Sequence, residues 1–345
     1  MSLPRMEDIA AQARVSLATV DRVLHGRSGV RAATVQRVMQ AAHAVGYVAG
    51  AEEAVAAAAK PTRIAFLIPA GSNRFLRMLG DLIGSSQEHW APFNVRCKAE
   101  YIEAFDPEAL ARQLLRHGSR CDGIAFMALE HPVVREAVAE LADRGVPTVT
   151  LISDLSHSRR SAYVGLDNRA AGRTAAYLIA RFMGAGVRGA KGKVAMIAGS
   201  LSYKAHEERE AGFLHLFHEQ YPGVHVVGAR EGHDDAEKNY RQARALFEQH
   251  GDLAGIYNIG GGAEGIGRAI HEMKLARKPV FIGHGLTPDT RALLIEGTMD
   301  AVITQNPLGA VMNCVRIFTN LRDRHDPTSG VEQVRSQVIF RENLP

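Results

Sequence analysis

The chain has 345 residues, of which 46% are hydrophobic and 23% are charged, and its formal net charge is +4. This length suffices for two or three domains, and the composition excludes a fibrous or disordered chain. No apolar run reaches the roughly 18 residues that cross a bilayer, and no hydrophobic signal region opens the chain. We therefore expect a cytoplasmic protein without a membrane partner. The cysteines are odd in number and widely spaced, which favours free thiols over disulfides or a metal site: Cys97, Cys121 and Cys314.

Three short helices are predicted within the first 48 residues. Apolar residues recur at helical spacing over residues 6–13, about 17–24 and about 32–45. Ser16 is placed to cap the second helix, and Gly46 ends the third. A turn of three to four residues joins the first two helices, which predicts a helix-turn-helix whose second helix enters the major groove of DNA.

The charge of this segment favours a nucleic-acid partner. The first 50 residues contain six arginines and no lysine against three acids, Glu7, Asp8 and Asp21, which gives a formal +3 suited to a phosphate backbone. The alternative is an ordinary three-helix bundle that binds no nucleic acid.

The wording of this segment is specific: it contains Val15-Ser16-x-x-Thr19-Val20-x-Arg22-Val23-Leu24, then Gly29-Val30 and Gly46-Tyr47. These motifs resemble the DNA-binding headpiece of the lac-repressor (LacI/GalR) family. The resemblance implies base contacts by Leu17, Ala18 and Arg22, and phosphate contacts by Ser16, Thr19 and His25. Asp21 departs from the family pattern, which usually has Ser there, so this carboxylate either pairs with a nearby Arg or faces away from DNA.

Residues 49–61 form an alanine-rich boundary between this headpiece (1–48) and the rest of the chain (62–345). In the resembling family the equivalent segment folds on DNA into a hinge helix and wedges a Leu into the minor groove. Here no Leu is present, and Val55 is the only branched apolar residue before Lys60. Either Val55 substitutes weakly for that Leu, or the segment is a flexible linker.

The remaining chain alternates between apolar strands and amphipathic helices, which predicts parallel sheets with right-handed crossovers. The run after Ile64 resembles the run after Val194, so we expect an α/β fold of two doubly wound halves with a ligand cleft between them. One half is expected to comprise residues 62–165 and 301–325, and the other residues 166–300 and 326–345. The predicted strands are 64–69, 123–127, 148–152, 194–198, 255–259, 280–283 and 301–304.

Two glycine-rich runs match a dinucleotide-binding pattern only superficially. The run 260–265 follows a strand, but the next strand ends in His284 rather than in an acid that could hold a ribose hydroxyl. The run 184–189 follows a helix and precedes a strand, whereas a dinucleotide-binding run follows a strand and precedes a helix. Ser200 and Ser202 lack a nucleophile elbow, so no hydrolase chemistry is indicated. We expect no enzyme activity and no cofactor.

Three motifs of the large module are distinctive: Ser72-Asn73-Arg74-Phe75, Glu207-Glu208-Arg209-x-x-Gly212-Phe213 and Ala301-Val-Ile-Thr-Gln305-Asn-Pro307. With them, residues 63–310 resemble the periplasmic sugar-binding fold that lac-repressor relatives carry as an effector domain, especially its ribose-binding branch. The ligand-binding residues that this resemblance implies are Asn73, Phe75, Asp154, Arg209, Asn258, His284 and Gln305.

Some of these positions stay open. His284 stands where ribose binders carry Asp, which argues against simple ribose specificity, and the register leaves open whether Ser153 or Asp154 points inward. Arg209 could instead pair with Glu208, and Asn73 could simply cap a helix.

These features together predict a DNA-binding transcriptional regulator and favour a repressor of a carbohydrate-utilisation operon. A homodimer would place two headpieces on a pseudo-palindromic operator, and a small sugar or polyol in the cleft would control binding. A solute-binding protein of a transport system and, less favoured, an α/β nucleotide-dependent enzyme are the alternatives.

Overall fold

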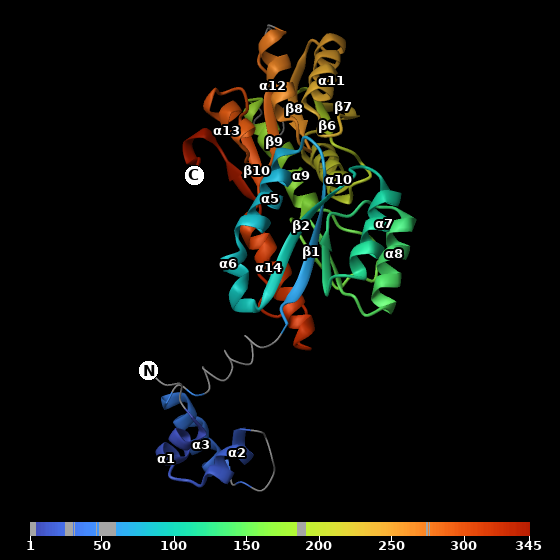
Figure 1. Cartoon of the computed structure of the whole chain (residues 1–345). Helices are drawn as coiled ribbons and strands as arrows, with labels where there is room; N and C mark the ends of the chain where they lie inside the picture. The colour runs from blue at the N-terminus through green and yellow to red at the C-terminus, as the bar shows by residue number, and fades with distance from the viewer. Residues whose placement is uncertain are drawn as a thin grey trace. The chain divides into compact units, whose positions relative to one another are not determined.

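The computed structural model describes residues 5–24, 30, 32–45, 47, 60–184, 191–273, 275 and 277–345. The chain divides into two compact units, residues 1–61 and 62–345 (Figure 1). The expectations for His25 and for Val55 lie outside the described residues.

The first unit contains the three expected helices, α1 (Met6–Ala13), α2 (Leu17–Leu24) and α3 (Ala32–Ala44). Arg14 ends α1 in the left-handed conformation with φ of 53°, which lets the chain turn toward α2. The buried side chains of Ile9, Val20 and Val38 come one from each helix and meet in a small core. Apolar burial on one face of each short helix therefore holds this unit together.

The second unit begins with a first lobe built on a five-stranded parallel sheet in the order β2-β1-β3-β4-β5. Its strands are β1 (Thr62–Pro69), β2 (Val95–Ile102), β3 (Gly123–Phe126), β4 (Thr148–Leu151) and β5 (Ala162–Val164). Helices and one 3-10 turn connect them: α5 (Arg74–Ser85), α6 (Gln87–Trp90), η1 (Ala91–Phe93), α7 (Pro107–Gly118) and α8 (Pro132–Asp143).

A second lobe is built on a six-stranded sheet in the order β11-β10-β9-β8-β6-β7, in which β11 pairs antiparallel with β10. Its strands are β6 (Gly192–Ala198), β7 (Val224–Glu231), β8 (Leu253–Asn258), β9 (Val280–His284), β10 (Ala301–Thr304) and β11 (Gln337–Ile339). Its helical segments are α9 (Asn168–Phe182), α10 (Lys204–Gln220), α11 (Ala236–Gln249), α12 (Ala263–Glu272), α13 (Pro288–Ile295) and the 3-10 turn η2 (Arg341–Asn343).

The chain passes between the lobes after β5, after β10 and after α14 (Pro307–Arg322). Residues 301–325 were expected to belong to the first half. This assignment is wrong for strand β10, which lies within that range. β10 pairs with β9 in the second sheet, whereas the α14 residues Val311, Val315 and Phe318 pack in the core of the first lobe. The crossover between the lobes lies between β10 and α14, which adjacency in sequence does not reveal.

Strands β2, β5, β7 and β11 were not predicted. In β2 the exposed residues Arg96 and Lys98 alternate with the buried residues Val95 and Cys97. All four strands lie at an edge of their sheet, where one side of the strand has no neighbouring strand. Edge strands therefore lack the continuous apolar run by which the buried strands were found.

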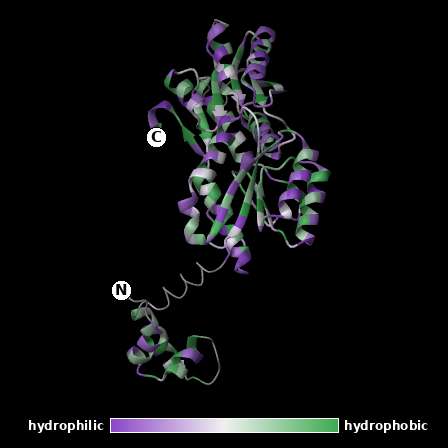
Figure 2. Cartoon of the chain, in the orientation of Figure 1, coloured by the Kyte–Doolittle hydropathy of each residue, from purple (hydrophilic) through white to green (hydrophobic). Residues whose placement is uncertain are grey.

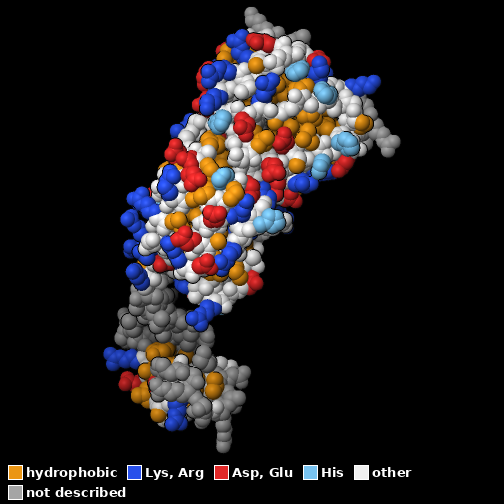
Figure 3. All heavy atoms as spheres, turned by 90° about the vertical axis from the view of Figure 1, so that its right-hand side faces the viewer, with side chains coloured by type: hydrophobic (Ala, Val, Ile, Leu, Met, Phe, Trp, Pro, Cys, Tyr) orange, Lys and Arg blue, Asp and Glu red, His pale blue; other side chains and the backbone are white. Residues whose placement is uncertain are grey.

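The interior of the second unit is apolar on both faces of each sheet. Figure 2 shows mainly hydrophobic residues along the central strands and hydrophilic residues on the outer helices. In the second lobe, one core packs against α9 and α10, and another packs against α11, α12 and α13. On the side of the second unit that carries α7 and α8, Figure 3 shows side chains of both charges interspersed.

The cysteines of the described chain are free thiols, and burial raises the pKa of Cys97 to about 12. Across the described ranges, the structure contains no helix that is both long and apolar enough to cross a membrane.

Candidate functional site

A cavity lies between the two lobes, at the carboxyl ends of the parallel strands, where doubly wound sheets bind ligands. Its volume is about 70 Å³ when measured to the centres of water-sized spheres. A single water needs only ~10–15 Å³ on that measure, so the cavity has room for a small ligand. Polar side chains from both lobes line it: Ser72, Asn73, Arg74, His206, Arg209, Glu264, His284, Thr287, Asp289, Thr290, Thr304 and Gln305. The apolar lining includes Phe75, Leu76, Met127, Ile152, Leu166 and Ile303.

Arg209 is held in the cavity wall by close packing of α9 against α10. A Cβ on Gly172 would lie 1.9 Å from the Arg209 carbonyl oxygen, and one on Gly212 would lie 2.1 Å from that of Arg169. The two glycines therefore let the helix backbones touch. Arg209 Nε then donates to Asn168 Oδ1 at 2.9 Å, and Nη1 donates to the Ile259 carbonyl at 2.9 Å. The residue is 7% exposed, and burial lowers the pKa of its guanidinium.

Two histidines in the cavity wall are neutral at pH 7. The pKa of His284 is lowered well below its usual value, first by burial and then by the nearby Arg209 charge. Its Nε2 lies 2.6 Å from the Tyr257 hydroxyl. Burial lowers the pKa of His206 to about 4, and its Nδ1 lies 3.0 Å from the Ser200 carbonyl oxygen. Neutral imidazoles offer hydrogen bonds without charge.

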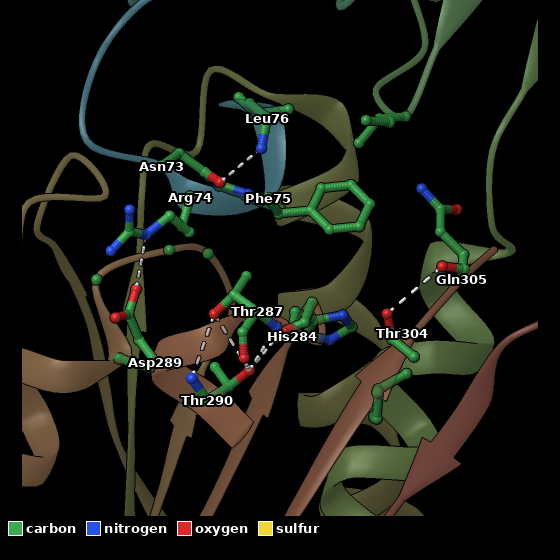
Figure 4. A pocket seen from close by; sticks show the side chains of 18 of the residues that line it. Asn73, Arg74, Phe75, Leu76, His284, Thr287, Asp289, Thr290, Thr304 and Gln305 are labelled. Atoms are coloured by element: carbon green, nitrogen blue, oxygen red, sulfur yellow. Dashed lines mark hydrogen bonds and ion pairs between the residues drawn. The ribbon is translucent and has the colours of Figure 1, made fainter. Parts of the chain in front are cut away.

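Phe75 and Gln305 face the same space from different elements. In Figure 4 the ring of Phe75 extends across the cavity above His284, and the Gln305 amide lies beside that ring. Phe75 stands in the first turn of α5, and Gln305 directly follows β10. Gln305 is 6% exposed, and its Oε1 has no hydrogen-bond partner in the described chain. An apolar ring beside a buried, unsatisfied amide is an arrangement that a polyhydroxy ligand would complete.

The glycine run after β8 forms one side of the cavity. A Cβ on Gly260 would lie 2.3 Å from Asp234 Oδ1, and Gly262 has φ of +68°, so both positions require glycine. Asn258 Nδ2 donates to the carbonyls of Gly260 and Gly261, and Asn239 Nδ2 donates to those of Gly261 and Gly262. Two buried asparagines thus fix the loop in its shape.

Hydrogen bonds join the two lobes across the cavity. Asp234, in the second lobe, accepts from Asn73 Nδ2 at 2.9 Å and from Gly261 N at 2.6 Å, and its carbonyl accepts from Ser72 Oγ at 2.9 Å. Arg74 Nε lies 3.2 Å from Asp289 Oδ2, as Figure 4 shows. The structure therefore represents a closed cleft.

Five of the residues expected to bind a ligand line this cavity: Asn73, Phe75, Arg209, His284 and Gln305. Asn73 also caps α5, because its Oδ1 accepts from Leu76 N. Helix capping was the alternative role expected for this residue. Arg209 has no ion pair within the described part of the chain, so the alternative pairing with Glu208 does not occur.

Two expected residues do not line the cavity. Asp154 binds Arg160 and accepts from the Thr150 hydroxyl. Asn258 is fully buried and supports the glycine loop instead. A strand's end predicts a position near the cleft, but not the direction in which the next side chain points.

Sequence reasoning also missed His206 and Asp234. His206 lies three residues before Arg209, close to one helical turn, so helical spacing could have placed it on the same side of α10. Asp234 lies in a loop with φ of 57° and belongs to no recognisable motif.

In the first unit, Leu17, Ala18, Thr19 and Arg22 lie in α2, and Ser16 directly precedes this helix. Leu17 is 46% exposed, and Ala18 and Arg22 are also exposed. Ser16 Oγ lies 2.9 Å from Thr19 Oγ1 and accepts from Thr19 N at 3.3 Å. The buried Val20 and the partly buried Val23 and Leu24 pack against the core of this unit, which leaves Leu17, Ala18 and Arg22 exposed.

Comparison with known families and relatives agrees with this two-part organisation. Residues 5–49 match the family of bacterial regulatory proteins, lacI family, and residues 99–323 match the periplasmic binding protein domain. An uncharacterized HTH-type transcriptional regulator of Streptomyces limosus is 29% identical over 73% of this chain and 66% of its own. The sucrose operon repressor of Escherichia coli is 33% identical over 39% of this chain and 40% of its own. The chain thus matches at most about two thirds of these relatives' lengths.

Solved structures extend the likeness of fold. A glucose-galactose binding protein from Geobacillus stearothermophilus superposes with a TM-score of 0.74 at 23% identity, over 83% of this chain and all of that one. A solute-binding protein from Burkholderia graminis, in complex with D-arabinose, gives a TM-score of 0.70 at 21% identity over 83% of this chain and 97% of its own.

A two-lobed periplasmic-binding-protein fold joined to a helix-turn-helix defines the class of this molecule. The chain belongs to the family of the periplasmic binding protein domain, and its residues 5–49 carry the helix-turn-helix of bacterial regulatory proteins of the lacI family. This confirms the fold class and the family indicated by the sequence. The closer likeness to the ribose-binding branch stays a prediction.

Proposed function

We propose that this protein is a cytoplasmic, sequence-specific transcriptional regulator whose operator binding is controlled by a small polyhydroxy ligand in the cleft. The observation that carries the proposal is the presence, in one chain, of a helix with exposed Leu17 and Arg22 and of a polar cavity between two lobes. Catalysis is not part of the proposed role, and no cofactor is required.

The ligand is proposed to act by stabilising the closed cleft. Asn73 and Asp289 already take part in contacts between the lobes, so a molecule bound between them adds contacts that exist only when the lobes are closed. A ligand shifts a conformational equilibrium only by its difference in affinity for the two states. The difference in affinity between the closed and open states is proposed to come from four residues: Phe75, Arg209, His284 and Gln305.

DNA recognition is proposed to use a homodimer, because two headpieces can read a pseudo-palindromic operator in successive major grooves. Leu17, Ala18 and Arg22 are proposed to contact bases, and Ser16 and Thr19 to contact phosphates. The names of the relatives, a transcriptional regulator and a sucrose operon repressor, support this role.

A solute-binding protein is the second candidate, because the fold is shared with sugar-binding proteins such as the arabinose-bound one. The helix-turn-helix match over residues 5–49 favours the regulator.

The test begins with selection of bound sequences from random duplex DNA by the full chain. A regulator should enrich a pseudo-palindrome, and its affinity should fall steeply with salt, by a slope of about −0.9 per neutralised phosphate. Sugars and polyols are then screened for a change in operator affinity. Failure to enrich any sequence, together with a nearly flat salt dependence, would favour the solute-binding protein.

A further inference from the structure

Arg209 carries a buried charge without an ion-pair partner in the described chain. A guanidinium has five N–H donors, and only two of them, one on Nε and one on Nη1, have an acceptor within the described chain. Both acceptors, Asn168 Oδ1 and the Ile259 carbonyl, are neutral. Three donors therefore remain for a ligand on a side chain that lines the cavity.

The acids near this charge are otherwise engaged or lie at the rim. Asp289 pairs with Arg74, and Asp234 accepts from Gly261 N and from Asn73. Glu264 lines the cavity but is exposed in the first turn of α12. None of these carboxylates is within ion-pair distance of Arg209 in the described chain. Arginine keeps its proton even when buried, so an anionic group of a ligand in the cavity would find an unpaired positive charge there.

A second feature favours negative charge in the same cavity. Helix α12 begins at Ala263, its N-cap Gly262 has no side chain to cap it, and both residues line the cavity. The N-terminus of a helix attracts anions through its free N–H groups and its dipole. Because Gly262 supplies no oxygen, the terminus can receive one from a ligand.

The rest of the lining suits neutral hydroxyl groups. His206 and His284 are uncharged hydrogen-bond partners, and Gln305 Oε1 is buried without a donor. The Phe75 ring supplies an apolar surface. The cavity therefore combines the unpaired charge of Arg209 with uncharged hydrogen-bonding groups.

We propose that the effector is a small polyhydroxy acid whose anionic oxygens pair with the three free donors of Arg209, while its hydroxyl groups bind His284 and Gln305. A carboxylate and a phosphate ester share this chemistry. The inference rests on the proposed function for its regulatory meaning, but the binding chemistry can be tested without DNA.

The experiment measures binding of matched acid and neutral pairs to the full chain at constant ionic strength and pH 7.5. D-gluconate with D-glucose and D-ribonate with D-ribose test a carboxylate, and D-ribose 5-phosphate tests a phosphate. At least one acid should bind about tenfold or more tightly than its neutral partner, which corresponds to about 1.4 kcal/mol. Whichever acid is preferred identifies the anionic group. Equal or tighter binding of the neutral partners overturns the proposal.

Simple anions provide a readout that does not depend on the correct carbon skeleton. Acetate and inorganic phosphate, compared with sodium chloride at equal ionic strength, should raise the melting temperature of the wild type. The rise should be lost in Arg209→Gln and retained in the matched surface variant Arg244→Gln, whose guanidinium lies on exposed α11. If neither these anions nor any acid stabilises the wild type, the proposal is wrong. Failure to bind an operator would instead overturn the regulatory function while leaving these results interpretable.

Discussion

Helix α2 and the cleft between the lobes place arginine in opposite environments. Arg22 is exposed on a short helix anchored by buried Val20, whereas Arg209 is 7% exposed and fixed by two hydrogen bonds. An exposed cation keeps its hydration and can adapt to a large anionic surface. A buried one has lost that hydration and must find matching groups at fixed positions. Helix α2 therefore suits a large anionic surface such as DNA, whereas the cleft selects a small ligand by geometry.

The largest effect is expected at Arg209. Arg209→Ala should weaken binding of the best ligand from the screen by roughly 2–5 kcal/mol, because truncating one member of a buried charged contact leaves the other unpaired. Isothermal titration measures this change. Arg244→Ala on the surface of α11 serves as the control, and its affinity should match the wild type. Unchanged affinity in Arg209→Ala would remove this residue from the site.

The next effect is expected at Arg22. Arg can grip a guanine with two hydrogen bonds, so Arg22→Ala should cost roughly 1–3 kcal/mol on the selected operator. It should also relax the preference at one base position, which titration against single-base operator variants would detect. A mutant with unaltered affinity and unaltered base preference would contradict the assignment of α2 as the base-reading helix.

A smaller effect is expected at Asp234, which joins the lobes. Asp234→Asn keeps the shape and tolerates φ of 57°, but one of the two donors, Gly261 N or Asn73 Nδ2, then faces an amide NH₂. Losing one hydrogen bond should weaken ligand binding by about 1 kcal/mol. Asp154→Asn is the matched control, because Asp154 binds Arg160 away from the cavity. Equal affinities in the two variants would show that the contact at Asp234 does not aid closure.

These residues also show what sequence can and cannot provide. Central strands and helices follow from apolar periodicity, and Phe75, Arg209 and Gln305 follow from a family resemblance. Asp154 was misplaced because one residue of register reverses a side chain's direction. Asp234 was missed because its role depends on Asn73, 161 positions away in sequence, and only the folded chain brings them together.

The smallest effect is expected in the pH dependence of the free energy of unfolding, and it comes from a histidine in the wall of the cleft. Burial lowers the pKa of His206 to about 4, so folding excludes a proton that the unfolded chain binds near pH 6.5. Above about pH 6.5 the imidazole is neutral in both states and does not lower the free energy of unfolding. As the pH falls from there toward 4, only the unfolded chain takes up the proton, so the free energy of unfolding decreases. Between pH 7 and pH 6 the loss should be about 0.7 kcal/mol for this one group. Urea unfolding of wild type and His206→Gln, followed at both pH values, measures it. Part of the pH dependence should remain in the variant, because the pKa of His284 is lowered as well. An identical pH dependence in the two proteins would mean that His206 does not titrate as its burial requires.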